Sequence, residues 1–168
     1  MTEPINKNML GQTGFRLVFD RLPTMTYFSQ GVGLPGISLS GAVTLPTPAI
    51  DYPLPGEKLT FSPFNVTFRV DEDMKNFLEL YNWLVGLGSP ESPDQYRRFQ
   101  NASINQNNLS DGTLVILSSK YNPNLRVKFR GMFPESISEL QFNTGATDID
   151  YLEATATFRY RDYVIESV

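Results

Sequence analysis

The sequence contains neither cysteine nor histidine. Without cysteine, the chain can form no disulfide bond, thiolate metal site or cysteine nucleophile. Without histidine, it lacks the commonest general base and the commonest metal ligand. Carboxylates, lysines, tyrosines and serines remain, and none of them falls in a recognisable activating arrangement. We therefore expect a protein that is not an enzyme, with no catalytic residue, no metal site and no cofactor.

Long apolar runs are also missing. No stretch approaches the roughly 20 apolar residues that a membrane helix needs, so no membrane partner is expected. Residues 1–8 lack the apolar core of a signal peptide, which indicates a chain that is intracellular where it is made. Cations are outnumbered, with 14 Lys and Arg against 18 Asp and Glu and a net charge of -4. This balance argues against ordinary nucleic-acid binding, which relies on neutralising phosphates.

The residues that are present favour a β-rich domain. A length of 168 residues suits one domain with a sizeable core, and 12 Gly with 12 Pro indicate many turns. Period-2 alternation and turn residues predict strands at 15–19, 27–32, 37–45, 59–70, 113–119, 125–131 and 150–164. Gly41 indicates a bulge or a close backbone approach, and Ser62-Pro63 a change of register. The expected fold is mainly β with one helix (α+β), an antiparallel sandwich or open barrel with the helix flanking its sheets.

One helix is predicted after residue 70. Asp71 is a suitable N-cap, and Glu72 and Asp73 favour the positive end of the helix dipole. The expected buried face carries apolar residues at helical spacing, namely Met74, Phe77, Leu78, Tyr81, Leu84 and Val85. Gly86 and Gly88 would end the helix, and Trp83 is expected in the core rather than in a ligand site.

Three segments stand apart from the predicted domain of residues 13–168: an N-terminal arm at 1–12, a Pro-rich hairpin at about 45–58 and a long polar loop at about 89–111. The hairpin has four prolines in ten residues, which cannot sit in a central strand. It also contains Ile50, Tyr52 and Leu54, which a purely solvated loop would not need. Either it folds back on its own domain, or it protrudes and buries these side chains on a neighbour.

Basic residues line one side of the strand at 125–131. Arg126, Lys128 and Arg130 alternate with apolar residues and could form a nucleic-acid surface, a solvated or salt-bridged outer face, or a match for acids on another subunit. In the last strand, Leu152, Ala154, Ala156, Phe158 and Tyr160 share one side, which predicts a core strand packed closely under a helix.

Other constellations carry weaker chemistry. Glu135 and Glu139 have no nearby group to act with, so a solvated face is expected. Residues 71–73 lack the glycine and distal glutamate of a calcium loop. Gly31-x-Gly33-x-x-Gly36 has dinucleotide-binding spacing, but Pro35 and the β-prone residues after it exclude the helix that this motif requires.

The order of motifs resembles that of the tail tube protein family of contractile-tailed bacteriophages, over about residues 14–164. The motifs, in chain order, are Leu34-Pro35-Gly36, the strand 64–70, Asp71-Glu72, the helix ending at Tyr81-Asn82-Trp83-Leu84, Gly131-Met132-Phe133-Pro134 and Ser138-Glu139-Leu140. Each motif is weak alone, and their shared order is the specific feature.

This resemblance implies a structural virion protein, made in the host cytoplasm, whose hexameric rings stack into a tube through which DNA passes without sequence-specific contacts. Partners would be further copies of the chain, a tail sheath protein and baseplate proteins. No appended domain is visible, which favours the repeating tube subunit; the alternative is a baseplate tube-initiator or a neck or terminator ring of the same fold. The protruding hairpin and the N-terminal arm then become the expected subunit interface, through Ile50, Tyr52, Leu54, Ile5 and Leu10.

Two further expectations follow. A channel for DNA should present acidic or neutral side chains, so Arg126, Lys128 and Arg130 should face away from it or be neutralised across a subunit contact. A remote alternative function is a small β-sandwich module that binds carbohydrate, which the aromatic residues Tyr96, Phe99 and Tyr121 would serve.

Overall fold

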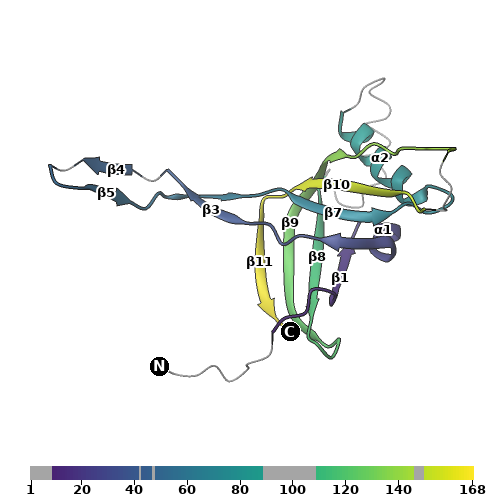
Figure 1. Ribbon diagram of the computed structural model, residues 1–168, viewed down its shortest axis with the longest axis horizontal. Helices are drawn as coiled ribbons and strands as arrows, with labels where there is room; N and C mark the ends of the chain where they lie inside the picture. Colours follow the sequence, from purple (N-terminus) through teal and green to yellow (C-terminus); the bar gives the residue numbers. More distant parts are fainter. Residues whose placement is uncertain (1–8, 42, 47, 89–108, 146–149) are drawn as a thin grey trace.

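The computed structural model describes residues 9–41, 43–46, 48–88, 109–145 and 150–168. Strands dominate these residues, and all of their pairings are antiparallel. Two helices, α1 (Pro23–Phe28) and α2 (Lys75–Gly88), lie among them at one end of the molecule (Figure 1). The predicted fold class, mainly β with a helix beside the sheets, is confirmed.

The body is one sheet with two halves, joined by the long strand β9 (Pro123–Ile137). The first half has the order β1 (Phe15–Phe19), β8 (Ser110–Leu117), β9 and β11 (Asp162–Ser167). The second half continues from the far end of β9 through β10 (Glu153–Arg159) and β7 (Phe64–Arg69) to β2 (Ser29–Val32). Figure 1 shows the strands of the two halves running across each other.

Gly131 allows β9 to pass from one half to the other. Its φ is +63°, a left-handed conformation that favours glycine, and its N–H donates to Asp111 Oδ1 at 2.9 Å. The predicted end of the strand at Gly131 is therefore wrong, because the chain bends there and continues to Ile137. Pro134 is accommodated beside a register shift in the ladder between β9 and β10, where a lost donor is tolerated.

The predicted last strand, 150–164, is two strands. β10 ends at Arg159 and β11 begins at Asp162. The break lies beside the bend in β9, since Arg161 N donates to Arg130 O at 3.0 Å. The predicted strand is therefore interrupted at the point where the neighbouring strand β9 bends.

The core lies between the two halves and under α2. The largest fully buried side chains are aromatic, and the ring centroids of Phe64 and Phe129 lie 4.5 Å apart. Ala154, Ala156 and Phe158 are buried on one side of β10, as the alternation predicted. Trp83 is 2% exposed and is a core residue, as expected.

The segment 27–32, predicted as a strand, is divided between α1 and β2. Pro23 stands in the first turn of α1, where its fixed φ suits a helix and its missing N–H is not needed. Met25 is fully buried, and Thr24 Oγ1 donates to Glu79 Oε2 on α2, so the short helix is held against the longer one. These tertiary contacts override the strand propensity of the aromatic residues.

The predicted start and buried face of α2 are wrong. The helix begins at Lys75, after Met74 with φ of 55°, so Asp71 is not its N-cap. Asn76 links strand and helix instead: its Nδ2 donates to Arg69 O at 2.7 Å, and Phe77 N donates to its Oδ1 at 2.8 Å. The buried positions are Asn76, Leu80, Trp83 and Gly86, whereas Leu78 and Tyr81 are about half exposed. Apolar residues lie on most sides of this helix, so periodicity alone did not fix the buried face.

Neither described helix is long and apolar enough to cross a membrane.

Candidate assembly surfaces

A two-stranded arm projects from the body (Figure 1). In it β3 (Ile37–Ser40) pairs with β6 (Lys58–Phe61), and β4 (Val43–Pro46) pairs with β5 (Asp51–Leu54). Gly41, with φ of +83°, lies between β3 and β4 and divides the strand predicted at 37–45. The strand predicted at 59–70 is divided as well, into β6 in the arm and β7 in the body. The arm, residues 37–61, is thus longer than the hairpin expected at 45–58.

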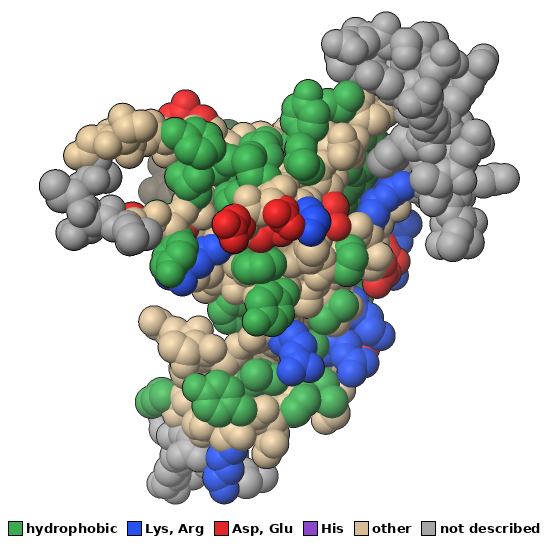
Figure 2. All heavy atoms as spheres, turned by 90° about the vertical axis from the view of Figure 1, so that its right-hand side faces the viewer, with side chains coloured by type: hydrophobic (Ala, Val, Ile, Leu, Met, Phe, Trp, Pro, Cys, Tyr) green, Lys and Arg blue, Asp and Glu red, His purple; other side chains and the backbone are tan. Residues whose placement is uncertain are grey.

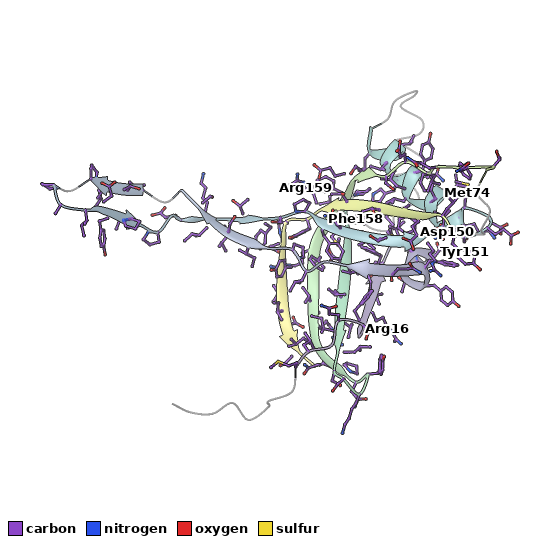
Figure 3. The ribbon with its side chains drawn as sticks, viewed as in Figure 1. Arg16, Met74, Asp150, Tyr151, Phe158 and Arg159 are labelled. Atoms are coloured by element: carbon purple, nitrogen blue, oxygen red, sulfur yellow. The ribbon has the colours of Figure 1, made fainter. Side chains whose placement is uncertain are left out.

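Each ladder of the arm has an apolar side and a polar side. Cross-strand partners project on the same side, and the register pairs Leu39 with Leu59 and Leu45 with Tyr52. The apolar sides of the two ladders, together called the apolar side of the arm below, consist of Ile37, Leu39, Val43, Leu45, Tyr52, Leu54, Leu59 and Phe61. All of these except Phe61 are exposed by 37% to 61%. Figure 3 shows side chains standing out on both sides of the arm, where the body does not cover them.

The polar side of the arm makes its own hydrogen bonds. Thr60 Oγ1 donates to Ser40 Oγ at 3.2 Å, and Ser40 Oγ donates to Lys58 O at 3.0 Å. These bonds do not involve the apolar side, whose large side chains face water in the single chain. Large exposed apolar patches mark interaction sites in soluble proteins, so the exposed apolar side chains of the two ladders give the arm the character of an interface.

The five predicted interface residues have different surroundings. Tyr52 and Leu54 lie on the apolar side of the arm, and Ile50 precedes β5 with 71% exposure. Leu10 is 58% exposed before β1, and Ile5 lies outside the described residues. Contact of any of them with a neighbouring subunit remains a prediction.

Basic and acidic residues face each other on the outer side of the first sheet half. The ladder between β9 and β11 places Asp162 opposite Arg130 and Glu166 opposite Arg126. Arg130 Nε lies 2.6 Å from Asp162 Oδ1, and Lys128 Nζ lies 2.8 Å from Glu166 Oε2. Of the three interpretations of the basic residues, the solvated or salt-bridged outer face is confirmed. Arg130 and Lys128 pair with acids of the same chain.

These pairs shift the acids toward ionisation. The hydrogen bond from Arg130 is the main cause that lowers the pKa of Asp162. The hydrogen bond from Lys128 likewise lowers the pKa of Glu166, with a further contribution from the charge of Arg126. The sequence contained both acids, but their pairing with β9 could not be read from it because β11 was not recognised as a separate strand.

The other predicted constellations do not form sites. Glu135 Oε2 lies 2.7 Å from Arg159 Nε, and Glu139 Oε1 accepts from Gln141 Nε2 at 2.9 Å, so the two glutamates have separate partners. Within the described residues no group of three or more acidic side chains is placed to hold a metal ion. Tyr121 is 68% exposed in the turn before β9, whereas Tyr96 and Phe99, like most of the predicted loop 89–111, lie outside the described residues.

The end of the body opposite the arm has a different surface. It carries the two helices (Figure 1), and exposed apolar residues include Tyr27, Leu78, Tyr81 and Tyr151. Figure 2 shows that acidic and basic side chains interrupt the apolar ones on this face.

Open strand edges form a second candidate surface. Among the described residues, β1 pairs only with β8, and β11 only with β9, so both ends of the first sheet half have an outer edge without a partner strand. Open edges favour pairing with another chain unless they are blunted. The sheet therefore offers two edges that further copies of the chain could join.

Known proteins resemble this chain in sequence and in fold. No protein-family model matches it. Its sequence is similar to the tail tube terminator protein of Enterobacteria phage T4, with 26% identity over 164 residues that cover 95% of this chain and 90% of that protein. Its fold is similar to a chain of the tube-terminating cap of the anti-feeding prophage, with a TM-score of 0.58, 11% identity and coverage of 99% and 97%. It is also similar to a chain of the sheath–tube complex of the PVC extracellular contractile injection system, with a TM-score of 0.57, 14% identity and coverage of 96% and 94%.

The two structural likenesses show that this chain shares its fold with chains of these assemblies. Together with the sequence similarity to a tail tube terminator, they confirm the predicted resemblance to the tail tube proteins of contractile-tailed bacteriophages.

Proposed function

We propose that this chain is the subunit of a ring that terminates the tube of a contractile tail. The observation that carries the proposal is the sequence similarity to a tail tube terminator, which extends over 95% of the chain. The similar chain in a tube-terminating cap supports it. Of the two roles expected from the sequence, the comparisons thus favour the terminator ring over the repeating tube subunit.

The ring would close through the open edges of the first sheet half. In a head-to-tail ring the edge of β1 in one copy meets the edge of β11 in the next, and every copy then has both edges covered. The family resemblance implies six copies, a lumen through which DNA passes, and a place in the virion after synthesis in the host cytoplasm.

The arm would contact another copy of the chain or the last ring of the tube. The apolar side of the arm, which includes Tyr52 and Leu54, supplies the contact together with Ile50, and Leu10 and Ile5 of the N-terminal arm add to it. The partners are further copies of this chain, the tube protein and, by family resemblance, a tail sheath protein and baseplate proteins. A similar fold in a sheath–tube complex supports this set.

Copy number separates a terminator from a repeating tube subunit. Quantitative mass spectrometry of purified particles should find this chain at about one ring per particle, far below the sheath protein of the same particles. A copy number equal to that of the sheath protein would contradict the proposal and restore the repeating subunit, which would add one ring for every layer of the tube.

A further inference from the structure

Two tyrosines contact the root of the arm, where residues 35–36 lead into β3 and Ser62 follows β6: Tyr160 lies between β10 and β11, and Tyr163 lies in β11. Tyr160 Oη donates to Ser62 O at 2.8 Å, immediately after β6. Tyr163 Oη donates to Pro35 O at 3.0 Å, shortly before β3. One hydroxyl group therefore binds the chain segment that enters the arm, and the other binds the segment that leaves it.

The rings of these tyrosines join the arm to the core. Phe61, at the end of β6, has its ring centroid 5.9 Å from that of Tyr160 and 5.5 Å from that of Tyr163. Phe129, which is fully buried, lies 5.1 Å from Tyr160 and 5.5 Å from Tyr163. Edge-on and tilted arrangements at these distances are favourable for aromatic rings. Burial, followed by the neighbouring Tyr163, raises the pKa of Tyr160 to about 12, so its hydroxyl remains a donor at neutral pH.

The arm lacks any strand pairing with the body in the described residues. β3 pairs only with β6, and β4 only with β5, in two sheets separate from that of the body. At the root, the segment that enters the arm and the segment that leaves it are joined by a hydrogen bond, in which Ser62 N donates to Gly36 O at 3.0 Å. Because the arm leaves the body at this root, a small rotation there would produce a large displacement at Ile50.

We propose that Tyr160 and Tyr163 are positioning residues that fix the direction of the arm, so that its apolar side is already oriented for a second copy of this chain or for the adjoining ring. The role in assembly rests on the proposed function, whereas the fixed direction is a property of the single chain. Pre-orientation matters because ordering a mobile segment on contact reduces the affinity of association.

The absence of cysteine makes a direct distance measurement simple. Spin labels on Asp51→Cys in the arm and Lys120→Cys in the turn before β9 report the position of the arm relative to the body. Labelled full-length protein is diluted with unlabelled protein so that only distances within one chain are recorded by pulsed electron paramagnetic resonance. The test variant is Tyr160→Phe with Tyr163→Phe, which removes both hydroxyl groups and keeps both rings. Tyr27→Phe, in α1 at the opposite end of the molecule (Figure 1), is the matched control.

We expect a narrow distance distribution for the parent and the control, and a broad, displaced one for the double variant. A second label pair within the body, Asn82→Cys with Lys120→Cys, should give the same distribution in all three proteins. An unchanged arm distribution in the double variant would overturn the proposal. Broadening of both label pairs would overturn it too, since the tyrosines would then support the whole body. Failure of the parent to form rings would count against the proposed function and would leave this measurement intact.

Discussion

Lys128 and Glu166 form a diagonal ion pair on the outer side of the first sheet half, with Nζ and Oε2 2.8 Å apart. Lys128 belongs to the central strand β9, which is recognisably basic in the sequence, and Glu166 to the edge strand β11. Two residues further along β9, Arg130 forms a second ion pair, with Asp162 directly opposite it in the ladder. The edge strand β11 thus supplies an acidic partner for Lys128 and Arg130, two of the three basic residues on this side of β9.

Removing the two acids should create a surface that retains DNA. We expect Asp162→Asn with Glu166→Gln to raise the affinity for double-stranded DNA at low salt. The slope of log affinity against log salt should become more negative by up to about 2. Each basic side chain that is freed from its acid and then neutralises a phosphate contributes about 0.9 to this slope. Fluorescence anisotropy with a labelled duplex measures both effects.

The control for this experiment changes the net charge equally on the arm. Asp51→Asn with Glu57→Gln also removes two negative charges, at exposed positions away from β9. An equal gain in affinity for both double variants would show that net charge, and not the exposure of Lys128 and Arg130, governs DNA binding.

Acid should loosen β11. The pKa values of Asp162 and Glu166 are lowered in the folded state, so their stabilisation is present above the ordinary carboxyl pKa and is lost as pH falls through the lowered values. We expect amide hydrogen exchange in β11, corrected for its intrinsic pH dependence, to become less protected in this range while β7 stays protected. In Asp162→Asn with Glu166→Gln the pH dependence in β11 should disappear; its persistence would assign the effect to other carboxyl groups.

The apolar side of the arm should be needed for assembly and dispensable for folding. Ile50→Ser, Tyr52→Ser and Leu54→Ser combined should leave the circular dichroism spectrum and the melting temperature nearly unchanged, because all three side chains are exposed in the single chain. Each lost contact should weaken association by about 1–3 kcal/mol, the free energy of burying one large apolar side chain. Light scattering and electron microscopy measure the assembled fraction.

Two polar changes serve as the control for the arm. Thr44 and Lys58 lie on the polar side of the arm. The variant with Thr44→Ser and Lys58→Ser should assemble like the parent protein. Normal assembly of the Ile50, Tyr52 and Leu54 variant would reduce the arm to a local feature of the surface.

The aromatic core should carry much of the stability of the body. Phe64 is fully buried against Phe129 and Phe158, and Phe64→Ala should lower the free energy of unfolding by about 3–5 kcal/mol. Phe142 is 73% exposed, so Phe142→Ala should change the free energy of unfolding by about 0.5 kcal/mol or less. Urea denaturation of the two variants provides the comparison.

Local alternation in the sequence predicted the strands whose two sides differ clearly. β1, β7 and β10 alternate between core and solvent, and their positions follow from period 2 alone. The motif order also predicted the family. In contrast, β9 continues past Gly131 and Pro134 because of its partners in two sheet halves, which is information that a single segment does not contain.

Features that depend on long-range pairing were missed for the same reason. The neutralisation of Lys128 by Glu166 requires β11 to turn back along β9, and the role of Tyr160 requires the root of an arm almost 100 positions earlier in the chain. The N-terminus of α2 was missed because Asn76, and not Asp71, takes the hydrogen bonds at that junction. A sequence signal existed only for the arm, whose apolar residues were unexpected in a proline-rich segment.

Electron microscopy of the purified full-length chain tests the central claim most directly. A terminator is predicted to form closed rings of a single layer at high concentration, and to leave them unstacked without the tube protein. Long tubes made by the chain alone would contradict the terminator and identify a repeating tube subunit. A chain that stays monomeric by light scattering at every concentration, with no rings on the grid, would contradict the assembly role altogether.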